Sequence, residues 1–286
     1  MNVQTLQDKH RNGQFTITVE LDPPKSAAST KTGLEAARLV NKVDAINIAD
    51  SPMANMRMSP IALAHIIQED YHIETIFHLT CRDRNLIGLQ AELLGAAALG
   101  VRNILTLTGD QPERGDHPQA KPVYETDSIG LIRIAASLNN GKDMAGNEVV
   151  DPANFYIGTT ANPGNPDLQQ EIEKLKIKID AGAGFVQTQP VYDMEVVKRF
   201  MEAVAPLGIP ILMGLLPLRG IKMATYLDTK VPGISVPPAV MERVAAGGRT
   251  AGLAITRELL GELKFIANGA HIMPLNDIDM MLAVLE

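Results

Sequence analysis

The chain has 286 residues, of which 45% are hydrophobic and 21% are charged. Its formal net charge of -7, without a sustained run of Lys and Arg, excludes a nucleic-acid surface that works by neutralising phosphates. Because Cys81 is the only cysteine, the chain alone builds no internal disulfide and no cysteine-rich metal or iron-sulfur site.

The first stretch, residues 1–14, is predicted to be an N-terminal extension. It lacks the apolar core of a signal peptide, and no apolar run further along is long enough to cross a bilayer. We therefore expect a cytoplasmic protein with no membrane partner. The six histidines do not show metalloprotease-like spacing, so we also predict no metal site.

Short apolar runs with strand-like composition recur along the whole chain. Helix-like segments such as 85–99 and 166–182 separate them, and this alternation predicts parallel pairing. Two helical patterns, 237–246 and 250–267, predict an extra helix before the last strand. The eight runs span residues 15–21, 45–50, 75–81, 103–109, 155–161, 185–190, 210–217 and 271–275.

Eight strand-helix units predict a (β/α)8 TIM barrel formed as a single domain by residues 1–286. An open doubly wound sheet is the alternative, but no G-x-G-x-x-G follows the first strand. In a barrel the active site lies at the C-terminal ends of the strands. The long loop 109–127 belongs to that face and is a candidate ligand lid, whereas 139–154 belongs to the opposite face.

Glu20 stands out among the residues at these strand ends, because it interrupts the apolar run FTITVELDPP, residues 15–24. An ionised carboxylate without a partner is costly in such a place. Glu20 therefore either marks a solvated strand end or has a chemical role. Other polar candidates at strand ends are Asp22, Asp50, His78, Thr80, Asp110, Thr160, Gln187 and Gln189.

Five motifs at the ends of five strands give the chain a resemblance to a known family. VELDPP, FHLTC, LTGDQP, KLKIKIDAGAGFVQTQPVYD and GLLPL occur in an order and spacing that resemble the methylenetetrahydrofolate reductase family, a flavin-dependent (β/α)8 barrel. The resemblance covers almost the whole chain. It implies an enzyme that interconverts 5,10-methylenetetrahydrofolate and 5-methyltetrahydrofolate. The substrate would be a folate and the cofactor a flavin, FAD or alternatively FMN.

The resemblance also implies roles for individual residues. Glu20 matches the acid that protonates the folate, so that its imidazolidine ring opens to an iminium; burial would keep such an acid protonated near neutral pH. Asp110 matches a carboxylate that contacts pterin and flavin, and Gln189 matches a glutamine that contacts the substrate. The implied cofactor contacts are Asp50, His78, Thr108, Gly109, Asp110, Asn165, Glu171 and Lys178.

Several positions depart from the family pattern. Thr108 stands where an arginine is usual and Asn165 where a histidine is usual, while Ala49 and Leu227 replace a threonine and an aromatic residue associated with the nicotinamide. These departures leave the use of NADH open. With them, the sequence resembles the acetogen-type branch of the family, in which the reductase is associated with a cysteine-rich partner. We therefore expect an oligomer that receives electrons through an iron-sulfur partner subunit.

Two other functions remain open at this point. A pterin-binding methyltransferase could use the same barrel and the folate without any flavin. A non-catalytic subunit could bind folate and position it for a partner. A flavin bound to the purified chain, and a requirement for Glu20 in turnover, distinguish the reductase from both.

Overall fold

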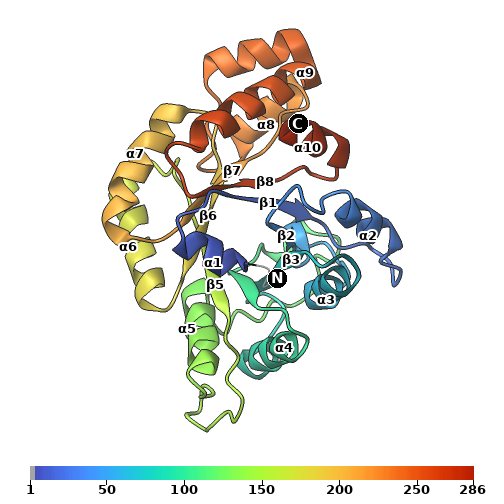
Figure 1. Cartoon of the computed structure of the whole chain (residues 1–286), viewed down its shortest axis with the longest axis vertical. Coiled ribbons are helices and arrows are strands. Elements are labelled where there is room, and N and C mark those ends of the chain that lie inside the picture. Colours follow the sequence, from blue (N-terminus) through green and yellow to red (C-terminus); the bar gives the residue numbers. More distant parts are fainter. Residues whose placement is uncertain (1–3) are drawn as a thin grey trace.

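Eight parallel strands close into one barrel in the computed structural model, which describes residues 4–286 (Figure 1). Each strand pairs with the next along the chain, and the last pairs with the first, so the predicted (β/α)8 fold is confirmed. The strands are β1 (Thr16–Leu21), β2 (Ala45–Ile48), β3 (Glu74–Thr80), β4 (Asn103–Leu107), β5 (Tyr156–Ala161), β6 (Phe185–Pro190), β7 (Ile211–Leu215) and β8 (Gly269–Ile272).

Helices surround the barrel and cover the outer faces of its strands (Figure 1). Several begin where an Asn or Asp side chain accepts a hydrogen bond from the first turn, as Asn85 and Asp127 do at α4 and α5. The α-helices of this layer are α2 (Thr30–Ala37), α3 (Pro60–Tyr71), α4 (Leu86–Ala98), α5 (Ser128–Asn139), α6 (Leu168–Asp180), α7 (Met194–Val204), α8 (Ile221–Lys230), α9 (Pro238–Leu263) and α10 (Ile278–Leu285). The short 3-10 helices are η1 (Pro52–Ala54), η2 (Pro112–Arg114) and η3 (Ala205–Leu207).

The connection between β7 and β8 contains two helices, α8 and α9, which confirms the predicted extra helix. The two helical patterns seen in the sequence are the two arms of α9, which meet at Gly248, where φ is 50° and ψ is -132°. The sequence pattern missed α8. That helix buries only Ala224 and Leu227, so its apolar stripe is too narrow to stand out.

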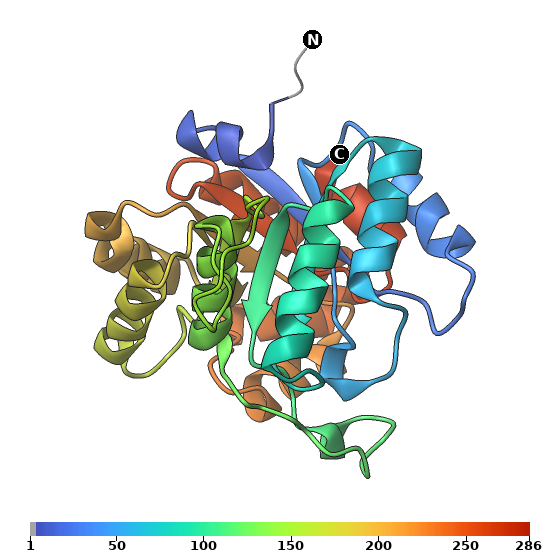
Figure 2. The same ribbon diagram turned by 90° about the horizontal axis from the view of Figure 1, so that it is seen from below.

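The chain before β1 forms a short helix, α1 (Leu6–Arg11), within the predicted N-terminal extension. Figure 2 shows α1 at one end of the barrel and the loop 109–127 at the other. Leu6 is 1% exposed and packs in an apolar cluster with residues that include Tyr156 and Phe185. His10 contacts the hydroxyls of Tyr156 (2.7 Å) and Thr16 (2.9 Å) through its two ring nitrogens. Helix α1 therefore closes the N-terminal end of the barrel.

This closure predicts that Leu6→Ala lowers the free energy of unfolding by about 2–4 kcal/mol, the usual range for emptying a buried leucine site. Urea denaturation followed by circular dichroism measures the change. Leu34→Ala is the matched control, because Leu34 is 62% exposed and its removal leaves no cavity. Equal effects of the two substitutions would show that α1 does not contribute to the core.

Candidate active site

A cavity of about 260 Å³ opens at the C-terminal ends of the strands. The structure brings Glu20, Asp50, His78, Asp110 and Gln189 together in its lining, as the sequence predicted. Gly109, Thr160, Gln187, His271 and Met273 complete much of the wall, with Leu105 and Leu107 as apolar members.

Glu20 is the penultimate residue of β1, and its side chain is 22% exposed in the cavity wall. Burial, and then the nearby charge of Asp22, raise the pKa of Glu20 to about 7. The nearest titratable nitrogen is Nε2 of His271, 3.9 Å from Glu20 Oε2. A carboxyl with this pKa is still protonated in a large fraction of the molecules at neutral pH and can donate that proton, which is the property that a general acid needs.

Behind Glu20, buried polar side chains form a hydrogen-bonded network across the barrel. Nδ1 of His271 lies 3.0 Å from the hydroxyl of Thr18 and 3.3 Å from Nδ2 of Asn47. Asn47 Oδ1 lies 3.1 Å from Nε2 of His78, and Gln187 Nε2 donates to the hydroxyl of Thr18 at 3.2 Å. Of these five residues, His78 and Gln187 were candidates from the sequence, whereas Thr18, Asn47 and His271 were missed.

The signal for the missed members was a polar residue inside an apolar strand. Asn47 interrupts the run AINI of β2 in the way that Glu20 interrupts β1, and His271 does so in β8. Both histidines of the network are buried. Burial lowers the pKa of His78 to about 4 and that of His271 to about 3. Both imidazoles are therefore neutral at physiological pH.

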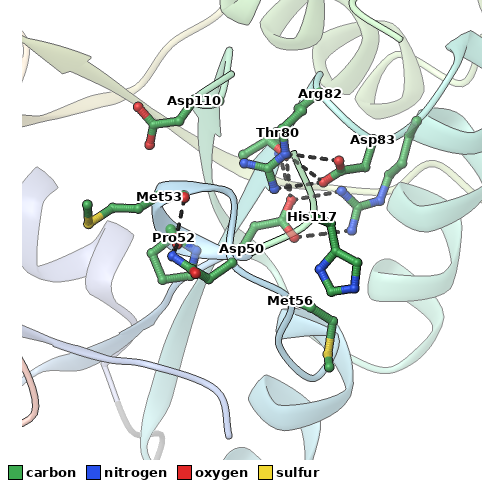
Figure 3. Close-up of polar contacts among 12 residues, drawn as sticks. Asp50, Pro52, Met53, Met56, Thr80, Arg82, Asp83, Asp110 and His117 are labelled. Atoms are coloured by element: carbon green, nitrogen blue, oxygen red, sulfur yellow. Dashed lines mark hydrogen bonds and ion pairs between the residues drawn. The ribbon is translucent and has the colours of Figure 1, made fainter. Parts of the chain in front are cut away.

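Asp50 follows β2 and anchors a second polar cluster beside the cavity (Figure 3). Its carboxylate accepts hydrogen bonds from the backbone N–H and the hydroxyl of Thr80, both at 2.9 Å, and forms an ion pair with Arg84 at 2.8 Å. Arg82 is buried and makes a two-pronged contact with Asp83 (Figure 3). The sequence analysis missed both arginines, although CRDR directly follows β3.

The turn after β4 places Asp110 at the cavity apart from the Asp50 cluster (Figure 3). Its side chain is 44% exposed and lies 3.5 Å from Arg114. Gly109 makes the turn with φ of 93°, and a Cβ there would lie 3.0 Å from the Cβ of Thr80. Asp110 and the less exposed Glu20 thus place two carboxyl groups in different surroundings at the same cavity.

Thr108 lies outside the main cavity. It lines a neighbouring hollow with residues that include Gln111 and Tyr124, and its hydroxyl accepts a hydrogen bond from the N–H of Ser128 at 3.3 Å. The structure therefore places Thr108 next to the loop 109–127, near the start of α5, while Gly109 beside it faces the cavity.

The predicted cofactor residues Asn165, Glu171 and Lys178 form a separate cluster near the end of β5. The buried carboxylate of Glu171 accepts hydrogen bonds from the N–H of Asn162 (2.9 Å) and from the side chain of Asn165 (3.1 Å). Lys178 Nζ donates to the carbonyl of Thr160 at 2.6 Å, and burial lowers its pKa. Thr160 lines the cavity, so this cluster adjoins the cavity through β5 without lining it.

The loop 109–127 docks on the segment that follows β2. Asp116 accepts hydrogen bonds from the N–H of Met56 (3.0 Å) and from His117 (2.8 Å), and it forms an ion pair with Lys25. At Gly115 a Cβ would lie 1.9 Å from the carbonyl oxygen of Ala54, so the two backbones touch. The role of this loop as a ligand lid stays a prediction.

Among residues 4–286, no helix is both long and apolar enough to cross a membrane. In the same range, no three His, Cys, Asp or Glu side chains are grouped as a metal site requires.

Comparison with protein families gives a match over nearly the whole chain. The model of a family described as methylenetetrahydrofolate reductase matches residues 5–286. Similar curated proteins include methylenetetrahydrofolate reductase 1 of Schizosaccharomyces pombe, 28% identical over 239 residues that make up 77% of this chain and 36% of that protein. A second, 5,10-methylenetetrahydrofolate reductase of Pectobacterium carotovorum, is 26% identical over 77% of this chain and 71% of its own.

The chain spans less than half the length of the first eukaryotic relatives that it matches, 36% and 39% in the two Schizosaccharomyces pombe proteins. One similar protein, from Arabidopsis thaliana, is named as an NADH enzyme, and one from Caenorhabditis elegans as an NADPH enzyme.

Solved structures resemble this barrel at low sequence identity. A protein from Clostridium thermocellum that binds two copies of 5-methyl-5,6,7,8-tetrahydrofolic acid superposes with a TM-score of 0.66 at 16% identity, covering 98% of this chain and 96% of that one. 2,3-Dimethylmalate lyase superposes with a TM-score of 0.57 at 12% identity, over 99% and 84%. These likenesses show the barrel fold.

The buried position of Glu20 predicts a pH dependence of stability. Between pH 4.5 and 7 the folded protein holds a proton on Glu20 that the unfolded chain has released, so this residue makes the fold less stable as the pH rises. Glu20→Gln removes this pH-dependent loss. The difference in free energy of unfolding between the variant and the wild type should therefore shift in favour of the variant by up to about 3 kcal/mol between pH 4 and pH 8. Urea denaturation at several pH values measures it.

The control for this experiment is Glu262→Gln, because Glu262 is exposed near the end of α9. Its stability difference from the wild type should be the same at pH 4 and pH 8. A Glu20→Gln difference that does not change with pH would contradict the assignment of a buried, protonated Glu20.

The turn at Gly109 predicts a second effect. Gly109→Ala strains a left-handed backbone and also brings the new methyl group within 3.0–3.2 Å of Thr80 and Arg82. Gly100→Ala is the matched control, since φ there is 74° and nothing lies within 4 Å of the added Cβ. The melting temperature should fall more in the Gly109 variant than in the Gly100 variant. Equal decreases would mean that the turn at Gly109 can accommodate a methyl group.

Proposed function

The chain belongs to the methylenetetrahydrofolate reductase family, and from this premise we propose that it is a flavin-dependent reductase of 5,10-methylenetetrahydrofolate. It interconverts that substrate and 5-methyltetrahydrofolate. The observation that carries the proposal is Glu20, a carboxyl in the wall of the cavity whose pKa is raised to about 7. Reduction of the methylene group needs an acid to open the folate ring, and Glu20 holds a proton under the conditions in which the reaction would run.

The folate is proposed to bind between Asp110 and Gln189 on one side and Glu20 on the other. A pterin ring presents N–H groups at its edge, and the half-exposed carboxylate of Asp110 and the exposed amide of Gln189 can accept from them. The Clostridium thermocellum barrel that binds a methylated folate supports this choice of ligand by its similar fold.

The cavity has features that suit a flavin. Leu105, Leu107 and Met273 give it apolar surface, and Gly109 keeps side-chain atoms away from its wall. Oε1 of Gln187 is buried without a hydrogen-bond partner among the described residues, which suits a bound group that carries N–H donors. We propose that residues of this wall, including His78 and Gly109, hold the ring. When bound and reduced, the flavin supplies the hydride.

For the rest of the cofactor we propose Lys178 and its neighbours Asn165 and Glu171. Thr108 carries no charge, and Arg82 and Arg84 are already paired with Asp83 and Asp50, so few cations are free to meet phosphates. FAD is the proposed cofactor, with FMN as the alternative.

In the proposed reaction, Glu20 gives its proton to the folate nitrogen that leaves as the five-membered ring opens. The product of this step is an iminium, whose electron-poor carbon can accept a hydride. Asp110 orients the pterin. The carboxylate left on Glu20 then regains a proton from solvent before the next turnover.

We propose that electrons reach the flavin through a partner subunit in an oligomeric assembly. Ala49 lines the cavity and Leu227 is 7% exposed within the core, so the two positions associated with the nicotinamide carry no hydroxyl and no exposed aromatic ring. Because two similar proteins are named as NADH and NADPH enzymes, direct reduction of the flavin by these donors is the alternative to test.

The chemical role of Glu20 predicts that Glu20→Gln binds flavin as the wild type does but reduces methylenetetrahydrofolate about 10²–10⁴ times more slowly, the usual effect of losing a general acid. The measurement is anaerobic: the protein is reduced with dithionite, mixed with the folate, and flavin reoxidation is followed by absorbance. Glu262→Gln should react at the wild-type rate. Unchanged reoxidation in Glu20→Gln would contradict the proposal, and a purified protein without flavin would favour the methyltransferase alternative.

The electron route predicts slow reduction by nicotinamides. NADH or NADPH mixed anaerobically with the purified chain should bleach the flavin at least about tenfold more slowly than a low-potential donor such as dithionite or reduced ferredoxin. Rapid bleaching by NADH would overturn the partner subunit while leaving the proposed reductase activity intact.

A further inference from the structure

His271 reaches the reacting side of the cavity through the pairing of β1 with β8. Its Nε2 faces Oε2 of Glu20 at 3.9 Å, and its Nδ1 faces Thr18 and Asn47. Among residues 4–286, no other Lys, Arg or His nitrogen lies within 4.0 Å of the Glu20 carboxylate. The question is which of the two ring nitrogens carries the proton, because only an N–H on Nε2 could stabilise that carboxylate.

The amide of Asn47 fixes the answer on one side. Its Oδ1 lies 3.1 Å from Nε2 of His78, so its Nδ2 is the atom that faces Nδ1 of His271, at 3.3 Å. An amide NH2 group only donates. Nδ1 of His271 must therefore accept, and it cannot carry the proton of a neutral ring.

The hydroxyl of Thr18 agrees with this polarity. It accepts a hydrogen bond from Nε2 of Gln187 at 3.2 Å, which leaves its own proton for Nδ1 of His271 at 3.0 Å. Nδ1 thus receives two donors, and the single proton of the neutral imidazole lies on Nε2. Burial, followed by the neighbouring His78, lowers the pKa of His271 to about 3, so the ring is neutral at working pH.

We propose that His271 is a positioning residue for Glu20: the network holds its proton on Nε2, pointed at the carboxyl, where it stabilises the carboxylate that forms when Glu20 gives up its proton. This inference rests on the proposed function and adds a second residue to it. The proton that leaves Glu20 goes to the folate nitrogen, while the N–H bond of His271 stays intact.

The geometry separates this role from a proton relay. A relay would need His271 to take up a proton on Nδ1 as it released one from Nε2, yet Nδ1 is enclosed by the donors of Thr18 and Asn47. Thr18 or Asn47 could pass a proton to Nδ1 only if the donors and acceptors of the whole chain of hydrogen bonds, as far as His78 and Gln187, exchanged their roles. His271 therefore acts on the carboxylate through the dipole of its N–H bond, from 3.9 Å, and does not exchange its proton in turnover.

Other titratable groups also face this region. Asp22 lies on the same strand end and raises the pKa of Glu20, and Asp110 lines the same cavity. Asp50 lines it too, with its charge held by Arg84, and His78 is neutral beyond Asn47. Of these groups Asp22 pushes the pKa of Glu20 upward, and His271 is the group placed to oppose it.

The first test is direct. ¹⁵N NMR of the wild-type protein, labelled at the histidine imidazoles and assigned with His271→Gln, reports which ring nitrogen of His271 is protonated. We expect a protonated Nε2 and an unprotonated Nδ1 from pH 5 to pH 8. A proton on Nδ1, or a ring that becomes doubly protonated in this range, would overturn the inference.

The second test measures Glu20 itself, by ¹³C NMR of the labelled glutamate carboxyl groups assigned with Glu20→Gln. His271→Leu removes the donor and should raise the pKa of Glu20 by at least one unit, a tenfold weaker release of its proton. His271→Gln keeps an N–H near the position of Nε2 and should restore most of that shift. A Glu20 pKa that is the same in all three proteins would overturn the inference.

The third test links the network to turnover. In single-turnover reoxidation by methylenetetrahydrofolate, the rate falls as the pH rises through the pKa of Glu20; this fall should occur at least one pH unit higher in His271→Leu and near the wild-type value in His271→Gln. A lower rate with an unmoved pH profile would mean a merely structural role. Absence of the reaction in the wild type would remove the proposed function, while the NMR results would still decide the inference on the Glu20 carboxyl.

Discussion

The pairing of β1 with β8 is the contact on which the proposed site depends. Its register sets Thr18 opposite His271, two residues that are 253 positions apart in the chain. Because successive side chains on a strand point to opposite faces, Glu20 lies on the same face as Thr18 and one step closer to the cavity. Closure of the barrel thus delivers the acid and its histidine to one place, and no local segment of the chain could do so alone.

Burial acts on the two kinds of group in opposite directions. It raises the pKa of the Glu20 carboxyl and lowers the pKa of the imidazoles of His78 and His271, because in each case it disfavours the charged form. At neutral pH the polar layer inside the barrel can therefore be uncharged, with Glu20 as the member nearest to ionising. Charged groups such as Asp50 are found at the strand ends, where Arg84 compensates them.

The parts of this structure that the sequence predicted are those set by local pattern. Alternating apolar runs identified the eight strands, and the barrel rule then placed Glu20 and Asp110 at the same face. The network partners escaped notice because hydrogen bonds such as Thr18–His271 depend on closure, which local pattern does not encode. Lys178 matched a motif, yet its contact with a β5 carbonyl could only be seen in three dimensions.

In the proposed reaction the site supplies a proton and orientation, and its own side chains supply no electrons. Conversion of the methylene bridge to a methyl group requires a hydride, that is two electrons with a second proton, in addition to the proton of Glu20. Cys81 is the only thiol in the chain, and it is buried with a pKa raised to about 12, so it stays protonated and is a poor nucleophile or redox group. A reductase built on this barrel therefore has to bind its electron carrier in the cavity. The apolar wall and the unpartnered Gln187 oxygen are the features that suit it to do so.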